Sequence, residues 1–442
     1  MGSRGENPQR LQSQGTQQWR CQYNPVASSL SDEDLGHLAH VIAGVNRTST
    51  TTMPPSRPNS TQLAVYRDPW RWVWLVSLFA PALVAAGPLL MWWTGDVVAL
   101  WWPLLFLYGV VPLADALIPP SSHNPPESVV AQLENDAYYR YITFALVPVL
   151  WAAFVFSAWF VASHTLPWHG WLAMVLATGA VGGFGINLAH EMGHQHNRLE
   201  RLLALCVLAP SAYGHFCVEH NRGHHVEVAT PHDTASSRMG ESIWAFLWRE
   251  MPGGAKRAWH YEAQRLQALG HGPLHWRNQI VQGWAVTAAL WAGLVFWLGP
   301  QVLGFIVPVA MWTNFQLTSA NYVEHYGLKR LQLPDGSYER CQPRHSWNSN
   351  HVLSNWMLFH LQRHADHHAH ATRRYQALRH FDDAPQLPSG YAGMFLVAYL
   401  PPLWFAVMNP RLLAAVEEDV ERINFQPTKR QALCRRYGLL PA

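Results

Sequence analysis

The sequence predicts an all-α integral membrane protein with six transmembrane helices. Charged residues make up only 13% of the chain and aromatic residues 12%, including 23 Trp; that charged share is about half the usual one. A soluble helical protein with buried core helices is the alternative, which six long apolar spans disfavour. Each span has about 20 residues or more, enough for a helix to cross about 30 Å of hydrocarbon. The spans cover roughly 70–93, 97–118, 141–163, 168–189, 278–297 and 300–322.

The segments outside the spans divide the chain into three parts. Residues 1–66 are rich in Ser, Gln, Thr, Asn and Pro and lack apolar periodicity, which predicts a disordered N-terminal extension. Residues 67–410 form the expected transmembrane domain, and residues 411–442 a C-terminal cytoplasmic tail. The late apolar patch "MFLVAYLPPLWFAVM" contains Pro401 and Pro402, so we expect it to pack or lie at the interface and not to span.

The distribution of basic residues predicts the orientation in the membrane. The spans come in three pairs, and the turns within the pairs ("TGD", "SHTLPW", "LGPQ") contain no Lys or Arg. Basic residues lie in the tail, in 119–140, in 190–277 and after 322. The positive-inside rule therefore places both termini and both large polar segments in the cytoplasm.

Four histidine-rich motifs stand at or beyond the span ends on this same side. They read "HEMGH", "EHNRGHH", "NYVEHYG" and "HADHH". Spacings of three and four place side chains on one helical face, and neutral imidazoles bind borderline metals. One zinc ion needs only three or four ligands, so nine histidines predict two metal ions. The candidate ligands are His190, His194, His220, His224, His225, His325, His364, His367 and His368.

An acidic residue accompanies each motif. Metal-bound histidines usually donate their second N–H to a carboxylate or a carbonyl, which fixes the ring tautomer. Some of these acids should do so, although the sequence does not say which. The candidates are Glu191, Glu219, Asp233, Glu324 and Asp366.

Other interpretations of the histidines remain open. "HEMGH" matches the HExxH pattern of zinc peptidases, but a peptidase needs one further ligand and not seven. A metal transporter would place its histidines at mid-membrane and not at the span ends. His360, four residues before His364, is a weaker candidate ligand. We expect ordinary structural roles for His196, His215, His232, His345, His351, His370 and His380.

Two further features exclude function classes. The net charge of +3 gives no electrostatic footprint for nucleic-acid binding. The five cysteines form no CxxC pair, which indicates inert thiols and excludes a fused four-cysteine iron domain.

With the four motifs in place, the chain resembles the membrane-bound alkane 1-monooxygenases over most of residues 68–410. The histidine spacings alone point to the wider superfamily with fatty-acyl desaturases and xylene monooxygenases, which stay as alternatives. "NYVEHYGL", "HSWNSNH" and "LQRHADHH" are more specific to the alkane hydroxylases.

The resemblance implies a cytosol-facing diiron site held by the nine histidines, in a bacterial inner membrane. It implies that one oxygen atom of O2 enters the terminal methyl group of an n-alkane to give a primary alcohol. It also implies electrons from a separate rubredoxin and its rubredoxin reductase.

Two finer hypotheses follow from the chemistry of such a reaction. An n-alkane concentrates in lipid, so we expect a tunnel between apolar helices, with Leu107 in the second span as a gauge of chain length. Basic residues near the motifs are candidates for docking an acidic rubredoxin, since complementary charge speeds encounter. They are Arg198, Arg201, Arg222, Lys329, Arg330, Arg373 and Arg374.

Overall fold

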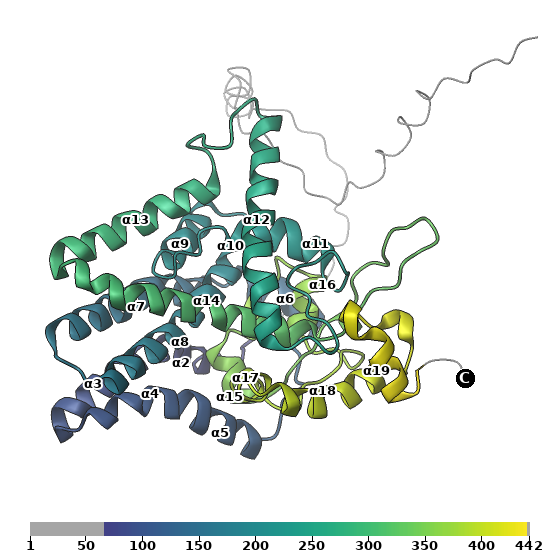
Figure 1. Ribbon diagram of the computed structural model, residues 1–442, viewed down its shortest axis with the longest axis horizontal. Helices are drawn as coiled ribbons and strands as arrows, with labels where there is room; N and C mark the ends of the chain where they lie inside the picture. Colours follow the sequence, from purple (N-terminus) through teal and green to yellow (C-terminus); the bar gives the residue numbers. More distant parts are fainter. Residues whose placement is uncertain (1–65, 440–442) are drawn as a thin grey trace, which may run out of the picture. The chain divides into compact units, whose positions relative to one another are not determined.

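The structure, a computed structural model, describes residues 66–439. These residues fold into helices and connecting loops (Figure 1), and within them extended pairing is limited to four isolated β-bridges. The predicted all-α class is confirmed. The predicted disordered extension, residues 1–66, lies outside the described residues except for Tyr66, so it stays a prediction.

Five helical segments are each long and apolar enough to cross a membrane. The first predicted span is instead a bent pair, Val73–Phe79 and Leu83–Thr94 (α3), whose axes differ by 58°. Pro81 lies at the break, where it cannot donate a backbone hydrogen bond. The described residues therefore hold five to seven candidate spans, and a count of six stays a prediction. The five segments are Val97–Leu117, Ala137–Ser163 (α7), Trp168–Gly193 (α8), Gln279–Leu298 (α13) and Pro300–His325, which includes α14 (Leu303–His325).

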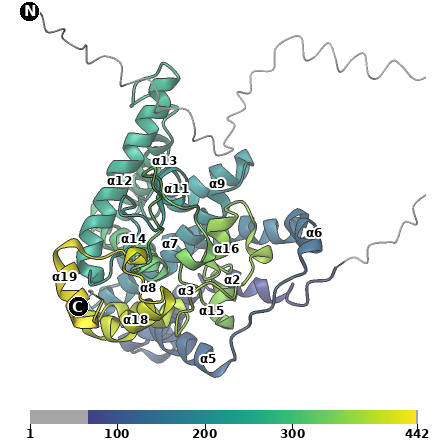
Figure 2. The same cartoon turned by 90° about the vertical axis from the view of Figure 1, so that its right-hand side faces the viewer.

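Shorter helices and one long polar helix complete the fold. The long one, α12 (Ile243–Ala268), stands across the direction of α13 and α14 in Figure 1. Figure 2 shows it reaching beyond the other helices. The shorter helices are α2 (Val76–Phe79), α4 (Trp102–Leu105), α5 (Val111–Leu117), α6 (Val130–Asn135), α9 (Arg198–Leu208), α10 (Phe216–Glu219), α11 (His225–Glu227), α15 (Val352–Met357), α16 (His364–Ala369) and α19 (Arg430–Tyr437).

Helices α8 and α14 pack closely against each other at the centre of the span bundle. Small residues on α8 make this possible: a Cβ atom on Gly182 would lie 2.3 Å from Oγ1 of Thr313, and Thr313 donates a hydrogen bond to the carbonyl oxygen of Gly179. The two helices carry His190 and His325 near their ends. Their close packing therefore fixes two of the four histidine motifs relative to each other.

We expect Gly283→Ala to lower stability. Gly283 of α13 touches the loop before the second histidine motif, and its added Cβ would lie 2.7 Å from the Cα of Gly214. Backbone cannot move aside as a side chain can, so we expect a loss of about 1–3 kcal/mol. Thermal unfolding in detergent measures it. Gly293→Ala on the same helix meets nothing within 4 Å and is the control; equal melting temperatures for the two variants would contradict the close contact.

The C-terminal residues pack onto the same unit as the spans. A second bent pair, Tyr391–Ala398 (α17) and Pro401–Ala415 (α18), turns by 119°. The sequence-based boundary at residue 410 falls inside α18. Beyond it, Ile423 and Phe425 are buried and form isolated bridges with Leu328 and Met239. Residues 411–439 therefore belong to the compact unit that begins at Tyr66.

Candidate metal centre

The structure gathers all nine predicted histidines into two adjacent clusters. Within each cluster the candidate ligand atoms lie within 4.8 Å of one another, and most of the side chains are buried. We call them the five-histidine cluster and the four-histidine cluster. The first contains His190, His194, His220, His225 and His367; the second contains His224, His325, His364 and His368.

Each motif sits where a helix ends or begins. His190 lies in the last turn of α8 and His194 caps its C-terminus, while His325 is the last residue of α14. The last motif forms the short helix α16, where His364 and His368 lie one turn apart in the four-histidine cluster and His367 faces the other cluster. Sequence spacing predicted such turn-to-turn pairs, and α8 and α16 have them.

The second motif departs from that spacing because its helix contains a π turn. Residues His220–His224 form this turn, and the backbone N–H of His225 donates to the carbonyl oxygen of His220. With about five residues in the turn, His220 and His225 share a face, which in a regular helix would belong to His220 and His224. His220 and His225 therefore enter the five-histidine cluster, and His224 points into the other.

The distances between ring nitrogens fit metal coordination. A metal–imidazole bond is about 2.0–2.1 Å long, so two ligands at right angles have nitrogens about 3 Å apart. In addition, the buried Nε2 atoms of His190, His194 and His224 have no hydrogen-bond partner within residues 66–439, and buried polar atoms without partners are rare. The Nε2–Nε2 distances are 3.0 Å for His220–His225 and His225–His367, 3.1 Å for His325–His364 and 2.9 Å for His364–His368.

Burial keeps four imidazoles of the five-histidine cluster uncharged. It lowers the pKa of His194 to about 3 and holds the pKa values of His220, His225 and His367 well below the ordinary value of histidine. Neighbouring imidazoles lower the pKa values further. The neutral ring is the form that offers a lone pair to a metal.

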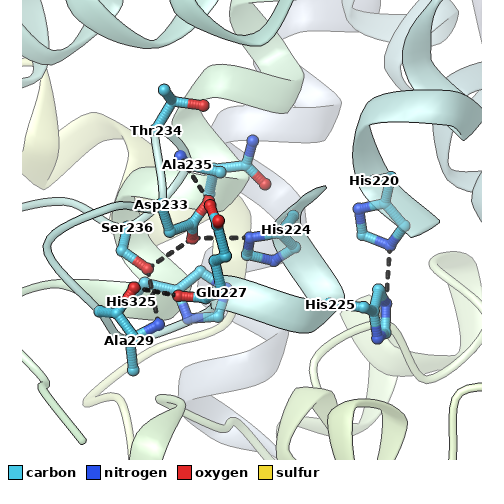
Figure 3. A network of polar contacts seen from close by, with 12 residues as sticks. His220, His224, His225, Glu227, Ala229, Asp233, Thr234, Ala235, Ser236 and His325 are labelled. Atoms are coloured by element: carbon cyan, nitrogen blue, oxygen red, sulfur yellow. Dashed lines mark hydrogen bonds and ion pairs between the residues drawn. The ribbon is translucent and has the colours of Figure 1, made fainter. Parts of the chain in front are cut away.

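Asp233 is the acid that holds a cluster histidine directly. Its Oδ2 atom accepts from Nδ1 of His224 at 2.9 Å and from Oγ of Ser236 at 2.7 Å, as Figure 3 shows. Its Oδ1 atom accepts from the backbone N–H of Ala235 at 3.1 Å. Although burial opposes both shifts, the pair raises the pKa of His224 and lowers that of Asp233. The contact leaves Nε2 of His224 to face the cluster.

Arg257 on α12 gathers the carboxylates behind the second motif. It forms ion pairs with Asp233 at 3.0 Å, with Glu227 at 2.7 Å and with Glu219. The guanidinium lies against Gly223, where an added Cβ would be 2.7 Å from Nη2. The glycine in "EHNRGHH" therefore makes room for this cation. Sequence reasoning missed Arg257, because no motif surrounds it.

Glu324 lies beside the four-histidine cluster. Its Oε2 atom is 3.4 Å from Nε2 of His364, and its Oε1 atom accepts from the hydroxyl of Tyr391 at 2.8 Å. Tyr391 was also missed, since an isolated tyrosine near an apolar patch carries no signal of its own.

The two remaining acids have other surroundings. Asp366 accepts from Arg373 at 2.9 Å, from the backbone N–H of Arg379 at 2.8 Å and from His370 at 2.8 Å, so it braces the loop that follows α16. Glu191 is buried on α8, and its Oε1 atom has no hydrogen-bond partner among the described residues.

His360 and the seven histidines expected to be structural lie outside both clusters. His360 packs its ring against Trp74, with centroids 4.7 Å apart. His345 bonds to Glu339 at 3.1 Å and His380 to Asp382 at 3.2 Å. The remaining five are His196, His215, His232, His351 and His370.

An apolar cavity of about 100 Å³ leads to both clusters. His190 and His220 of one cluster and His364 of the other line its inner end. Leu107, in the π turn Phe106–Val110 of the second span, lines it farther away, and its side chain is buried. Along α14 the lining runs from Glu324 to Gln316. The cavity therefore follows the spans away from the histidines.

Several of the basic residues proposed for docking have partners inside the protein. Arg222 bonds to Glu262 at 3.0 Å, Arg374 to Glu200 at 2.8 Å, and Arg330 to the carbonyl oxygen of Val226 at 2.8 Å. Arg373 is bonded to Asp366 as described above. These four side chains hold the fold together around the clusters.

The fold and the site place the chain in the class of membrane desaturases and hydroxylases. Its helices include candidate membrane spans, and its two histidine clusters lie at the end of an apolar cavity. Residues 165–398 match the family model for fatty acid desaturases. The chain is 46% identical over 376 residues to alkane 1-monooxygenase 1 of Alcanivorax borkumensis (85% of this chain, 93% of the relative). It is 44% identical over 372 residues to alkane 1-monooxygenase of Pseudomonas putida (84% and 92%).

A more distant relative is the xylene/toluene monooxygenase hydroxylase component of Pseudomonas putida. It is 30% identical over 230 residues, which is 51% of this chain and 60% of that relative. Identity and coverage both favour the first two relatives. The chain belongs to the alkane 1-monooxygenase family.

Proposed function

We propose that this enzyme hydroxylates the terminal methyl group of n-alkanes to primary alcohols, with O2 as co-substrate and two iron ions held by the nine histidines. One observation carries the proposal: an apolar cavity ends at two histidine clusters that fit metal coordination. Affinity alone would favour other metals such as copper. The choice of iron in this proposal therefore rests on family membership.

The bound irons would supply the oxidising power that an unactivated C–H bond requires. The nine imidazoles would hold them, and Asp233 orients His224 through its Nδ1 atom. The apolar cavity walls receive the alkyl chain, which gains about 0.8 kcal/mol for each CH2 removed from water, or roughly 6 kcal/mol for eight carbons. The same walls keep bulk water from the reacting end.

Metal analysis combined with turnover tests the proposal. Purified protein should contain about two irons per chain, as nine nitrogen ligands allow. With octane, O2, NADH, rubredoxin and rubredoxin reductase it should form 1-octanol. A single zinc ion with peptide cleavage would identify a peptidase instead. An olefin from a fatty-acyl substrate, or a benzylic alcohol from xylene in place of octanol, would identify one of the related activities.

Leu107 is proposed as a gauge of chain length. Because it lines the cavity away from the histidines, a larger side chain there should block the space that longer alkanes need. We expect Leu107→Trp to move the preferred substrate toward shorter alkanes, with turnover of the longest ones reduced at least about tenfold. Product profiles across alkane lengths measure the change. An unchanged preferred chain length would contradict this role of Leu107.

A separate rubredoxin is proposed to dock on the face that carries the basic residues. Arg201, exposed on α9, is the test position because its charge faces solvent. We expect Arg201→Glu to slow reduction by rubredoxin several-fold at low salt and much less at high salt, because salt screens exposed charges. Stopped-flow reduction at two ionic strengths measures this. A rate independent of both charge and salt would remove Arg201 from the docking surface.

The orientation and cellular location are part of the same proposal. The domain that begins at residue 67 would cross a bacterial inner membrane six times, with both termini in the cytoplasm. The basic segments and the histidine motifs would then share the cytoplasmic side. A protease site placed in the exposed loop at 333–337 should be cut in inverted vesicles and protected in spheroplasts; the reverse pattern would refute this orientation.

A further inference from the structure

Two asparagine side chains line the apolar cavity close to the histidine clusters. Asn187 lies three residues before His190 on α8, and Asn321 lies four residues before His325 on α14. At these spacings a helix places two side chains on one face, about one turn apart. Both asparagines are buried, and most of the residues that line the cavity with them are apolar. Each helix therefore presents an amide to the cavity one turn before a cluster histidine.

The two asparagines lie at the same level of the packed helices α8 and α14. The carbonyl oxygen of Gly179 accepts from Thr313, and an added Cβ on Gly183 would lie 3.0 Å from the Cβ of Gln316. Because these contacts advance along both helices together, α8 and α14 run in the same direction here. About one further turn along each helix reaches its asparagine. The two amides therefore belong to the same stretch of the cavity wall.

The hydrogen bonds of both amides leave their oxygen atoms to the cavity. Nδ2 of Asn187 donates to the carbonyl oxygen of Leu358 at 2.7 Å, and Nδ2 of Asn321 donates to Oε1 of Glu250 at 3.2 Å. Neither Oδ1 atom accepts a hydrogen bond within the described residues. Unlike the enclosed polar atoms of the core, both oxygens can still be reached by a molecule of the size of water. They are acceptors that a ligand in the cavity can use.

The other polar side chains near them have partners. The hydroxyl of Tyr108 donates to Oε1 of Gln316, farther from the histidines. The hydroxyl of Tyr391 donates to Oε1 of Glu324, whose Oε2 atom lies against the ring of His364. Of the side-chain amides that line the cavity in the described part of the chain, only the two asparagines thus keep an unpaired oxygen.

An alkane cannot use these oxygens, whereas the products of the proposed reaction can. An alkane has no O–H or N–H group, so it leaves both acceptors without the hydrogen bonds that they would form in water. The proposed reaction converts RH and O2, with two electrons and two protons, into ROH and H2O. Both products carry O–H donors, and the new hydroxyl is on the carbon that lay nearest to the histidines.

We propose that Asn187 and Asn321 form a subsite for the hydroxyl group of the primary alcohol. This inference rests on the proposed function, because the alcohol is the product of that reaction. An Oδ1 atom accepts from the O–H group, while the alkyl chain keeps the place in the cavity that the alkane had. The two residues do not act on the C–H bond. They determine specificity, since they make the enzyme hold an alcohol more tightly than a molecule of the same size without a donor.

The first test compares two isomeric ligands on the iron-loaded full chain in nanodiscs. 1-Octanol and 1-methoxyheptane have the same formula, but only the alcohol can donate a hydrogen bond. Empty nanodiscs correct for the partition of each ligand into lipid. We expect the alcohol to bind at least about tenfold more tightly than the ether. Equal affinities would overturn the proposal. The measurement needs no turnover, so a failure of the proposed function is seen separately, as absence of 1-octanol formation from octane.

Substitutions then locate the acceptors. Asn187→Leu together with Asn321→Leu removes both oxygens at similar side-chain size, and we expect it to abolish the preference for the alcohol while octane binds as well as before. Asn135→Leu is the control: its amide also donates to a carbonyl oxygen, but it is exposed at the end of α6 and outside the cavity, so the preference should remain.

Two results of the double substitution would contradict the subsite. A preference that survives it would assign the hydroxyl to another acceptor, such as Glu324. Equal losses of octane and octanol affinity would show that the asparagines only shape the cavity. The ratio of the two affinities therefore separates recognition of the hydroxyl from a structural role.

Discussion

His364→Ala is expected to lower the iron content from about two ions to one or fewer per chain and to cut octane turnover at least about 1000-fold, or about 4 kcal/mol in the barrier. Nε2 of His364 lies 3.1 Å from that of His325 and 2.9 Å from that of His368, in a cluster that has four members among the described residues. With three nitrogens left, the cluster cannot hold its ion in the same geometry. Iron analysis of the purified variant measures this without reference to activity.

The matched control lies two residues beyond the same motif. His370→Ala makes the same chemical change six residues later, on a half-exposed ring that contacts Asp366 and neither cluster. We expect this variant to keep both irons and near-normal turnover. Full iron content in His364→Ala, or an equal iron loss in the two variants with unchanged melting temperatures, would refute the assignment of His364 as a ligand.

The clustering of the histidines could be predicted from the sequence because local spacing and one-sided topology both restrict where the rings can go. Their division between clusters could not be predicted. In the second motif, the spacing of four does not place His220 and His224 in one cluster, because the π turn pairs His220 with His225. The π turn packs against α12, where Arg257 lies over Gly223. The sequence of the motif alone does not indicate that contact.

The acids show the same limit. All five stand in or near a histidine motif, yet among the described residues only Asp233 and Glu324 place a carboxylate oxygen within 4 Å of a ring nitrogen of a cluster histidine. Asp366, inside the last motif, instead braces the following loop through Arg373. Sequence adjacency places a carboxylate near the site, but the direction of its side chain depends on residues far away in the chain. For the same reason Arg257 and Tyr391 were missed.

The predicted spans agree with the structure more closely than the predicted acids do, because spans follow from local composition. Five of the predicted spans are single helical segments. In lipid the backbone must form a continuous run of hydrogen bonds, so the length of an apolar run predicts the length of the helix. The first is broken beside Pro81, which hydropathy alone does not register.

Asp233→Asn is expected to weaken iron binding about 10- to 100-fold, the range typical for a group that orients a metal ligand. Each oxygen of Asp233 accepts two hydrogen bonds: Oδ2 from His224 and Ser236, Oδ1 from Ala235 and Arg257. The NH2 group of asparagine would therefore face two donors in either orientation. Arg257 would lose one of its carboxylates in both orientations, and in one of them His224 would also lose its fixed ring position.

Competition with a chelator measures the affinity, and reconstitution with excess iron separates an orienting role from damage to the fold. We expect added iron to restore much of the turnover of Asp233→Asn, because the nine histidines are still present. Asp335→Asn is the control: in the described part of the chain its carboxylate accepts hydrogen bonds from Ser337 of the same exposed turn, one at 2.6 Å, so iron affinity should not change. If Asp233→Asn bound iron as tightly as Asp335→Asn, the carboxylate behind His224 would have no part in holding the metal.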